Sequence, residues 1–529
     1  MALFWPHPAA RAGAPDAGAL AWLAAPGFVL ALILGYLALH FALRFVTGPA
    51  LGMDDAEQAL FAQTWSWSYR FRQPPLFTWL ALPLFEALGP GILALSILRY
   101  LMLGLTYLCL YLAARRWIGD PRLAALSVFS VALIYLFAYY AHHDLTHTTA
   151  LGATIAASFY VFSRLVERPS TLNYALLGIC FGLGLLAKWN FVILAAALPL
   201  ACLLRPELRG LILTWRTLLA GALMAVIAAP SALWVASHRA FARVTDATLG
   251  AGLPQSFLST VAEGTSALAK SALVFSLPFL PLFLIVFGPT LWRDLRRSSL
   301  GEAAGAQAVT PAFLGLLVLI ALGLNWLLVP TLGAVAFHER WMHPALMILP
   351  VFLFALLDRA RPSPRAISVY LGVIAAAVVI AAGTRIAVAT LGAETCGKCR
   401  DLIRFDQLAD GLRAAGFERG TIVVPPEEFH IGGNLRLVLP ESRIVDPAYP
   451  PSLWPAPQPD GQCLIVWQAG HPDSASIRAA LEAYLAETLA VPADAARVAG
   501  EARAAIAGSD GRSYTLAYEL LPRGPGLCH

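Results

Sequence analysis

Charged side chains are scarce in this chain of 529 residues. Only 13% of its residues are Asp, Glu, Lys or Arg, whereas 58% are hydrophobic. A soluble globular protein carries about 25% charged residues, so this chain has too few to cover a surface that faces water. The composition therefore excludes an ordinary soluble protein and predicts that lipid covers much of the molecule.

Lysine is almost absent. It occurs only at positions 188, 270 and 398, and Arg supplies the other basic side chains. The net charge of +5 is small, so we expect no nucleic-acid partner. The sequence also lacks the Gly-rich loop that would hold the phosphates of a nucleotide.

Cysteine is present at seven positions, three of them inside apolar runs where a buried, inert thiol is expected: Cys109, Cys180 and Cys202. Cys396 and Cys399 form a C-x-x-C, which fits a redox motif, half of a zinc site or a short disulfide. No second C-x-x-C or His cluster follows to complete a four-ligand zinc site. If the segment lies outside the cytoplasm, a disulfide is favoured.

Long apolar runs dominate the first three quarters of the chain. Eleven of them approach the length that crosses a hydrocarbon layer of about 30 Å. They lie at about 20–45, 91–113, 123–141, 145–166, 172–187, 190–204, 214–236, 271–292, 311–330, 342–357 and 366–391. The first run is too long for the core of a signal peptide, so we expect a retained helix. The fifth and sixth are short and also fit one broken hairpin.

Arginine placement predicts which loops stay in the cytoplasm, because those loops are enriched in Arg and Lys. Every second loop is basic: Arg115, Arg116 and Arg122; Arg164 and Arg168; Arg205, Arg209 and Arg216; Arg293, Arg296 and Arg297; Arg359, Arg361 and Arg365. The connections between them are therefore expected on the opposite side: 46–90, 141–145, 188–190, 237–270 and 331–341.

The C-terminal region has an ordinary charge density and a different pattern. Strand-like and helix-like segments alternate there, at 420–424, 464–467, 401–415 and 475–490. They indicate a small α/β domain, which the odd helix count places outside the cytoplasm. The sequence thus predicts a mainly α fold, with a polytopic membrane helical bundle over residues 1–392 and an α/β domain over residues 393–529.

The first outward loop carries three carboxylates in four residues, at Asp54, Asp55 and Glu57. Carboxylates so close together repel one another unless they share a cation, a proton or a ligand. Aromatic and basic residues follow: Trp65, Trp67, Tyr69, Arg70 and Arg72. A solvated acidic loop with an aromatic interface belt is one interpretation, and a ligand site is the other.

A second cluster lies at a junction of two apolar runs, with His142, His143, Asp144 and His147. Ionisable groups at a membrane boundary are costly to place against lipid, so they should face the protein interior or a water-filled cavity. Asp144 also fits a helix-capping role. The spacing of His143 and His147 fits a metal pair but is common by chance, so we assign no metal ligand; a divalent cation is the one cofactor left open.

Two further outward segments supply cations. Lys188 lies between two short apolar runs, where it either snorkels to the interface or points at an anionic ligand. In the segment His338-Glu339-Arg340, the planar donor fork of Arg340 suits phosphate or carboxylate, unless Glu339 neutralises it. An acid beside several cations suits a reaction in which the carboxylate acts as base and the cations hold a leaving phosphate.

The order of four motifs resembles a known group. The motifs are Asp54-Asp55 followed by Pro74-Pro75-Leu76; Asp144; Gly184-Leu185-Leu186-Ala187-Lys188-Trp189; and Glu339-Arg340-Trp341 with Pro344. Together they resemble the GT-C superfamily of membrane glycosyltransferases that use polyprenyl-phosphate sugars. The likeness is to the bacterial branch with the aminoarabinose and galacturonic acid transferases of lipid A and the protein O-mannosyltransferases. Asp55 replaces the usual Glu, and Gln73 stands where the lipid A branch often has Lys.

The resemblance implies an inverting transfer from a polyprenyl-phosphate-linked sugar to a lipid or glycan acceptor, such as lipid A or lipopolysaccharide. It implies a catalytic set of Asp54, Asp55 and Asp144, with Asp54 as the base. The residues expected to bind the donor phosphate or substrate are Arg72, Lys188, His142, His143, His338, Glu339 and Arg340.

The resemblance also implies a place in the inner membrane. There the chain contacts membrane lipids, and the active site, the loops 46–90 and 237–270 and the C-terminal domain face the periplasm. The alternative function is a transporter or flippase for a lipid-linked or anionic glycan, since carboxylates and histidines at membrane depth also build proton relays.

Overall fold

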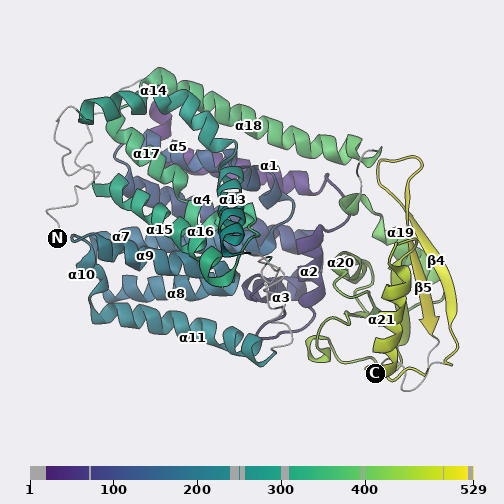
Figure 1. Cartoon of the computed structure of the whole chain (residues 1–529). Coiled ribbons are helices and arrows are strands. Elements are labelled where there is room, and N and C mark those ends of the chain that lie inside the picture. Colours follow the sequence, from purple (N-terminus) through teal and green to yellow (C-terminus); the bar gives the residue numbers. More distant parts are fainter. Residues whose placement is uncertain are drawn as a thin grey trace.

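A computed structural model describes residues 20–70, 73–238, 250, 256–299, 309–394, 396, 399–492, 494–521 and 528. A bundle of long helices forms one part, and a smaller part built on a β-sheet lies beyond one end of the bundle (Figure 1). The predicted mainly α fold with a small C-terminal α/β domain is confirmed. Arg72, a predicted phosphate-binding residue, lies outside the described residues.

The helices of the first part follow the chain in this order: α1 (Pro26–Arg44), α2 (Met53–Phe61), α3 (Leu76–Leu88), α4 (Ile92–Trp117), α5 (Pro121–Phe129), α6 (Tyr135–Ala138), α7 (Thr146–Glu167), α8 (Thr171–Ala187), α9 (Val192–Leu204), α10 (Arg209–Ile212), α11 (Trp215–Ser237), α13 (Phe257–Ser276), α14 (Phe279–Ser299), α15 (Val309–Leu332), α16 (His343–Leu346), α17 (Leu349–Ala360) and α18 (Pro364–Leu391). The predicted loops 46–90 and 237–270 are thus partly helical, through α2, α3 and α13. Sequence hydropathy missed α2 and α3 because both are too short to cross a membrane.

Among the described residues, six helices are long and apolar enough to cross a membrane, and one bent pair would make a seventh. The six are Pro26–Arg44, Ile92–Trp117, Thr146–Glu167, Trp215–Ser237, Pro311–Leu332 and Pro364–Glu394, and the bent pair is Glu339–Leu346 with Leu349–Ala360. Three other predicted runs correspond to shorter apolar helices, within Pro121–Leu133, Thr171–Ala187 and Trp189–Leu204. The structure therefore supports a multi-pass membrane protein, with fewer full-length spans than the predicted eleven.

Two predicted spanning runs are broken. The run 123–141 divides before Tyr135, and the run 271–292 divides at Pro278. Proline has no backbone N–H and disfavours a helical conformation of the preceding residue, which explains the second break. The N–H of Tyr135 donates to the carbonyl oxygen of Leu277 at 3.1 Å. A backbone N–H at one break thus donates to a carbonyl oxygen at the other, in a region where lipid offers no hydrogen-bond partner.

The bundle packs around α7, which contacts α4 on one side and α8 on the other, while α8 also packs on α11. Small residues allow α8 and α11 to approach each other closely. A Cβ on Gly178 would lie 2.4 Å from the carbonyl oxygen of Ala220, and one on Gly182 would lie 2.7 Å from a side-chain atom of Ile227. Close backbone approach through small residues is the usual way in which membrane helices associate.

The C-terminal part is a five-stranded sheet in the order β2-β1-β3-β5-β4. Its strands are β1 (Gly420–Val423), β2 (Arg443–Val445), β3 (Gln462–Gln468), β4 (Val498–Ala505) and β5 (Ser513–Leu521), and its helices are α19 (Phe405–Ala414), α20 (Phe429–Val438) and α21 (Ser474–Glu487). β1 pairs in parallel with β2 and β3, whereas β5 runs antiparallel to β3 and β4. The predicted strands and helices are all found, and α20, β2 and the β4–β5 pair are additional.

Two disulfides join cysteines in and near this part. One links Cys396 to Cys399, as favoured from the sequence, and the other links Cys463 to Cys528. Cys109, Cys180 and Cys202 are free thiols within the bundle.

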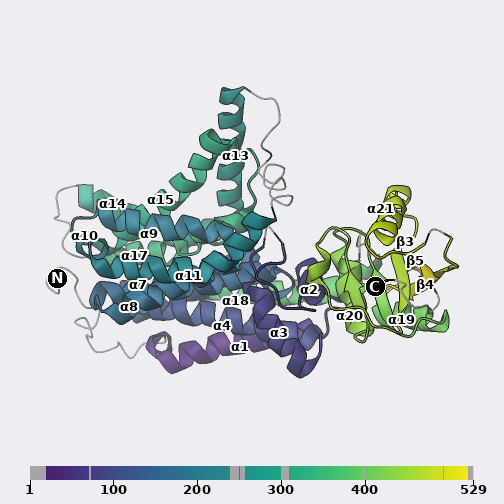
Figure 2. The same ribbon diagram turned by 90° about the horizontal axis from the view of Figure 1, so that it is seen from below.

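The C-terminal part is attached to the bundle mainly through α2 and α20, which lie side by side in both views (Figures 1 and 2). The backbones meet so closely that a Cβ on Gly433 would lie 2.1 Å from the carbonyl oxygen of Ala56. The side-chain amide of Asn434 accepts from Leu51 N at 2.7 Å and donates to Leu51 O at 3.3 Å. The segment just before Asp54 is therefore held against α20 by two hydrogen bonds.

Candidate active site

The carboxylates of α2 lie in its first turn, where unpaired N–H groups and the helix dipole favour negative charge. Asp55 forms an ion pair with Arg99 of α4, and both residues are only 2% exposed. A buried pair of this kind satisfies both charges. The carboxylate of Asp55 is therefore committed to a structural contact.

Asp54, one residue earlier, is only partly buried. Its carboxylate has no hydrogen-bond or ion-pair partner within the described part of the chain. Its backbone N–H donates to Oδ1 of Asp144 at 2.8 Å. Asp54 is thus fixed by its backbone while its side-chain oxygens remain available to a ligand.

Asp144 caps α2 rather than α7, the helix that follows it in the sequence. Its carboxylate also packs against Gly52, where an added Cβ would lie 3.2 Å from Oδ1. Burial, with the neighbouring carboxylates of Asp54 and Asp55, raises the pKa of Asp144 well above its usual value. Three acids thus meet at the start of one helix.

Lys188 lies in the turn between α8 and α9. Its ammonium group donates to Oγ1 of Thr148 on α7 at 3.2 Å. Burial and the charge of Arg340 lower the pKa of Lys188 to about 8, while Asp54 and Glu57 act in the opposite direction. Lys188 therefore interacts electrostatically with one cation, Arg340, and with two acids of α2, Asp54 and Glu57.

Arg340 belongs to a 3₁₀ turn, Glu339–Met342, whose backbone is fixed by bonds from Asn190 to Trp341 O at 3.1 Å and between His343 Nδ1 and Arg340 O at 2.9 Å. Neither Arg340 nor Lys188 has an acidic ion-pair partner in the described ranges, and Glu339 does not neutralise Arg340. Lys188 thus interacts electrostatically with Arg340 on one side and with the available carboxylate of Asp54 on the other.

The other predicted residues beside Arg340 are His338 and Glu339. His338 is exposed, with its ring 4.9 Å from that of Trp341. Glu339 is partly buried and acts electrostatically on His338 and on Tyr135 of α6. His338 also interacts electrostatically with Arg340 and Lys188, and the substrate-binding role of both residues stays a prediction.

His142 and His143 do not join the cluster around Asp54. His142 is buried, stacks on His40 at 3.9 Å and bonds through Nε2 to the Tyr36 hydroxyl at 2.7 Å. His143 bonds through Nε2 to Asp401 of the C-terminal part at 2.7 Å. The two histidines thus contact α1 and the C-terminal part, and their substrate-binding role stays a prediction.

The spacing of His143 and His147 left a metal pair open, and the structure places the two rings against different neighbours. His147 bonds to Gln58 at 2.8 Å, so it faces a different neighbour from His143. Within the described residues, no three His, Cys, Asp or Glu side chains are grouped to hold a metal ion.

Sequence reasoning missed two charged contacts of this site. Arg99 was visible as a charge inside a predicted spanning run, which is a signal of function or of a buried pair. Arg70 contacts Glu57 at 3.2 Å and Glu427 at 3.5 Å, and its guanidinium stacks 4.9 Å from the Phe429 ring. Glu427 and Phe429 belong to the C-terminal part, so no local pattern could have revealed them.

Known proteins match most of the chain. The family described as dolichyl-phosphate-mannose-protein mannosyltransferase matches residues 72–234. Lipopolysaccharide core galacturonosyltransferase RgtA of Rhizobium johnstonii is 31% identical over 449 residues, which are 83% of this chain and 86% of the relative. RgtB of the same organism is 34% identical over 334 residues, which are 63% of this chain and 66% of that relative.

Solved structures match the fold. The structure of ArnT from Cupriavidus metallidurans bound to undecaprenyl phosphate gives a TM-score of 0.57 at 16% identity, covering 93% of this chain and 98% of that one. The apo structure of the same protein gives 0.52 at 16% identity, covering 92% and 98%.

Fold and relatives together define a multi-pass inner-membrane glycosyltransferase. The chain belongs to the GT-C superfamily, within the group that contains the lipopolysaccharide core galacturonosyltransferases RgtA and RgtB. The resemblance drawn from the four sequence motifs is confirmed at this level.

Proposed function

We propose that this chain transfers a sugar from a polyprenyl-phosphate donor to a lipid or glycan of the cell envelope, with inversion at the anomeric carbon. The observation that carries the proposal is that Lys188 interacts electrostatically with both Arg340 and Asp54, while among the described residues the Asp54 carboxylate has no partner and neither cation has an acidic ion-pair partner. A base needs free lone pairs, and a leaving phosphate needs cations that are not already paired.

In the proposed reaction, Asp54 accepts the proton of the acceptor hydroxyl. The hydroxyl oxygen forms a bond to the anomeric carbon while the bond from that carbon to the phosphate oxygen breaks. The electron pair of the broken bond leaves with polyprenyl phosphate, whose charge Lys188 and Arg340 stabilise. Attack from the face opposite the phosphate inverts the sugar.

The remaining acids have supporting roles in this proposal. Asp144 holds the first turn of α2 through the N–H of Asp54, and the pair of Asp55 with Arg99 fixes the same turn against α4. Positioning of this kind matters because a misplaced catalytic group costs rate even when its chemistry is unchanged.

The relatives support a choice of substrates and of membrane side. RgtA and RgtB are named for lipopolysaccharide core and galacturonic acid, which supports a uronic acid as the sugar and lipopolysaccharide core as the acceptor. ArnT, solved with undecaprenyl phosphate, supports that lipid as the carrier. The basic alternate loops support a site and a C-terminal part that face the periplasm.

The donor-binding role of Lys188 is tested with purified protein, a radiolabelled polyprenyl-phosphate sugar and a lipopolysaccharide extract. Lys188→Gln is expected to lower kcat/KM for the donor by about 10²-fold, because one charge on the leaving phosphate is lost. Lys270→Gln is the matched control, since Lys270 is exposed on α13, and it should match wild type. Equal activity of both variants would contradict the role, and absence of transfer with every donor would favour transport.

Donor binding should also depend on pH. Because the pKa of Lys188 is lowered to about 8, the ammonium form that binds phosphate is present below that pH and is lost above it. The KM for the donor should therefore rise as pH increases through about 8. Lys188→Arg should remove this rise, since an Arg side chain keeps its charge. A rise that persists in the Arg variant would assign it to another group.

A further inference from the structure

Basic side chains outnumber acids where α1 and α18 meet the C-terminal part. Arg385 and Arg400 line a cavity there with one carboxylate, Asp401, among the described residues, and nearby Arg44 interacts electrostatically with both Asp55 and Asp401. Arg44 donates to Gly48 O at 3.0 Å and Ala50 O at 2.8 Å, and Asp401 is already bonded to His143. The junction therefore has more positive charge than its own acids balance.

Arg385 of α18 is the most buried of these cations, with an exposed fraction of only 2%. Its partners in the described part of the chain are all neutral: His40 Nδ1 at 3.0 Å, His40 O at 3.2 Å, His142 O at 3.2 Å and the Tyr100 hydroxyl. Its Nε atom is buried and has no hydrogen-bond partner among the residues that the structure describes. A buried guanidinium without an anion is costly, which indicates that an anion completes the site.

A cavity of about 130 Å³ lies beside Arg385. Its polar lining comes from Thr47, Tyr139, His143, Arg385, Arg400 and Asp401. The guanidinium of Arg400 has no hydrogen-bond or ion-pair partner in the part of the chain that the structure describes. Two guanidinium groups thus line a space suited to the oxygens of a phosphate.

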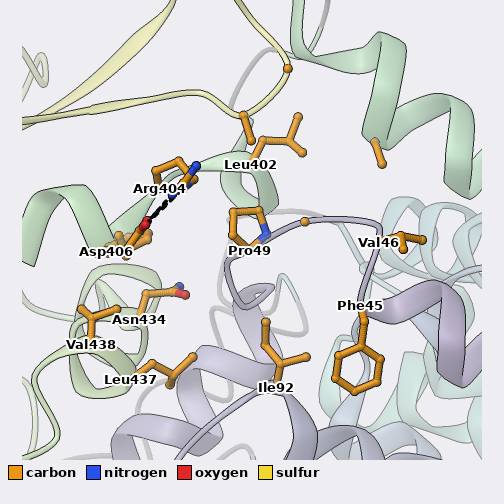
Figure 3. Close-up of a pocket in the computed structure, with 15 residues that line it drawn as sticks. Phe45, Val46, Pro49, Ile92, Leu402, Arg404, Asp406, Asn434, Leu437 and Val438 are labelled. Atoms are coloured by element: carbon orange, nitrogen blue, oxygen red, sulfur yellow. Dashed lines mark hydrogen bonds and ion pairs between the residues drawn. The ribbon is translucent and has the colours of Figure 1, made fainter.

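A larger cavity of about 550 Å³ adjoins the first, and Ala389 and Leu402 line both. Figure 3 shows that bundle residues, including Phe45, Val46 and Ile92, and C-terminal residues, including Leu437 and Val438, line this cavity. Phe45 and Val46 are 48% and 66% exposed at the end of α1. An apolar space at the end of a membrane helix is suited to an acyl chain.

We propose that this junction binds one anionic phospholipid from the leaflet on the side of the C-terminal part. Arg385 and Arg400 hold its phosphate in the smaller cavity, and an acyl chain occupies the larger one. The lipid supplies the missing negative charge and attaches the C-terminal part to α1 and α18.

This lipid site is separate from the proposed donor site. The side chain of Asp144 contacts α2, whereas those of His142 and His143, just before it, contact α1 and the C-terminal part. The short segment that carries the three residues therefore lies between the two sites.

Native mass spectrometry of the purified full-length chain tests the proposal. Protein stripped of lipid is exchanged with phosphatidylglycerol or with phosphatidylcholine, and retained molecules are counted. Arg400→Gln is expected to weaken retention of phosphatidylglycerol about tenfold, because a charge-assisted contact is lost. The matched control is Arg503→Gln, since Arg503 is exposed on β4, is paired with Glu501 and lines neither cavity, so this variant should retain the lipid as wild type does.

A second variant tests the cavity itself. Ala389→Trp, at the wall shared by both cavities, should also lower retention about tenfold. The proposal is overturned if Arg400→Gln retains phosphatidylglycerol as well as wild type, if phosphatidylcholine is retained equally, or if lipopolysaccharide displaces the phospholipid one for one. Because the measurement requires no sugar transfer, its failure is distinct from failure of the proposed function.

Discussion

Asp54→Asn is expected to lower kcat for sugar transfer by about 10²- to 10⁴-fold, the usual contribution of a general base. The amide cannot accept the proton of the acceptor hydroxyl, while the backbone N–H bond to Asp144 does not depend on the carboxylate. Donor affinity should therefore stay near that of wild type. Single-turnover transfer from a radiolabelled donor measures the loss directly.

A matched control separates a lost base from a lost negative charge. Asp410→Asn makes the same chemical change on an exposed residue of α19, whose carboxylate contacts Arg413 alone within the described ranges. This variant should transfer sugar as wild type does. If Asp54→Asn also keeps wild-type turnover, Asp54 is not the base.

Asp55→Asn should instead damage stability. It leaves Arg99 buried without its ion-pair partner, which typically costs about 3–5 kcal/mol of unfolding free energy. Unfolding of the detergent-solubilised protein by heat or denaturant measures the change in unfolding free energy. We expect this variant to lose activity in proportion to the folded protein that remains, in contrast to Asp54→Asn.

The double variant Asp55→Leu with Arg99→Leu tests this explanation. Replacing both members of a buried ion pair by apolar residues is often neutral, so the double variant should recover most of the lost stability. If it is as unstable as Asp55→Asn alone, the pair is not the source of the effect.

Composition and hydropathy were sufficient to predict the fold class because a lipid-facing surface changes residue usage over hundreds of positions. The breaks before Tyr135 and at Pro278 were not predicted as a pair. Their backbone groups satisfy each other across a long stretch of sequence, and hydropathy reports only local composition. The same limit explains why the contact between α2 and α20 was missed.

The candidate site was predictable in part, because its residues lie at loop ends where charge is unusual. The direction of each side chain was not predictable. Leu145 has a left-handed φ of 68°, and this turn separates the helix α7 from the three residues His142, His143 and Asp144. Such a local conformation depends on packing against α1, α2 and the C-terminal part, so only the folded chain distinguishes Asp144 from its two neighbours.

A structure of the protein with an undecaprenyl-phosphate sugar bound is the most direct test of the proposed centre. We expect the phosphate oxygens at about 3 Å from Lys188 Nζ and from the Arg340 guanidinium, with the anomeric carbon facing Asp54. A donor phosphate bound elsewhere, for example at Arg385 and Arg400, with Lys188 and Arg340 unoccupied, would contradict the account.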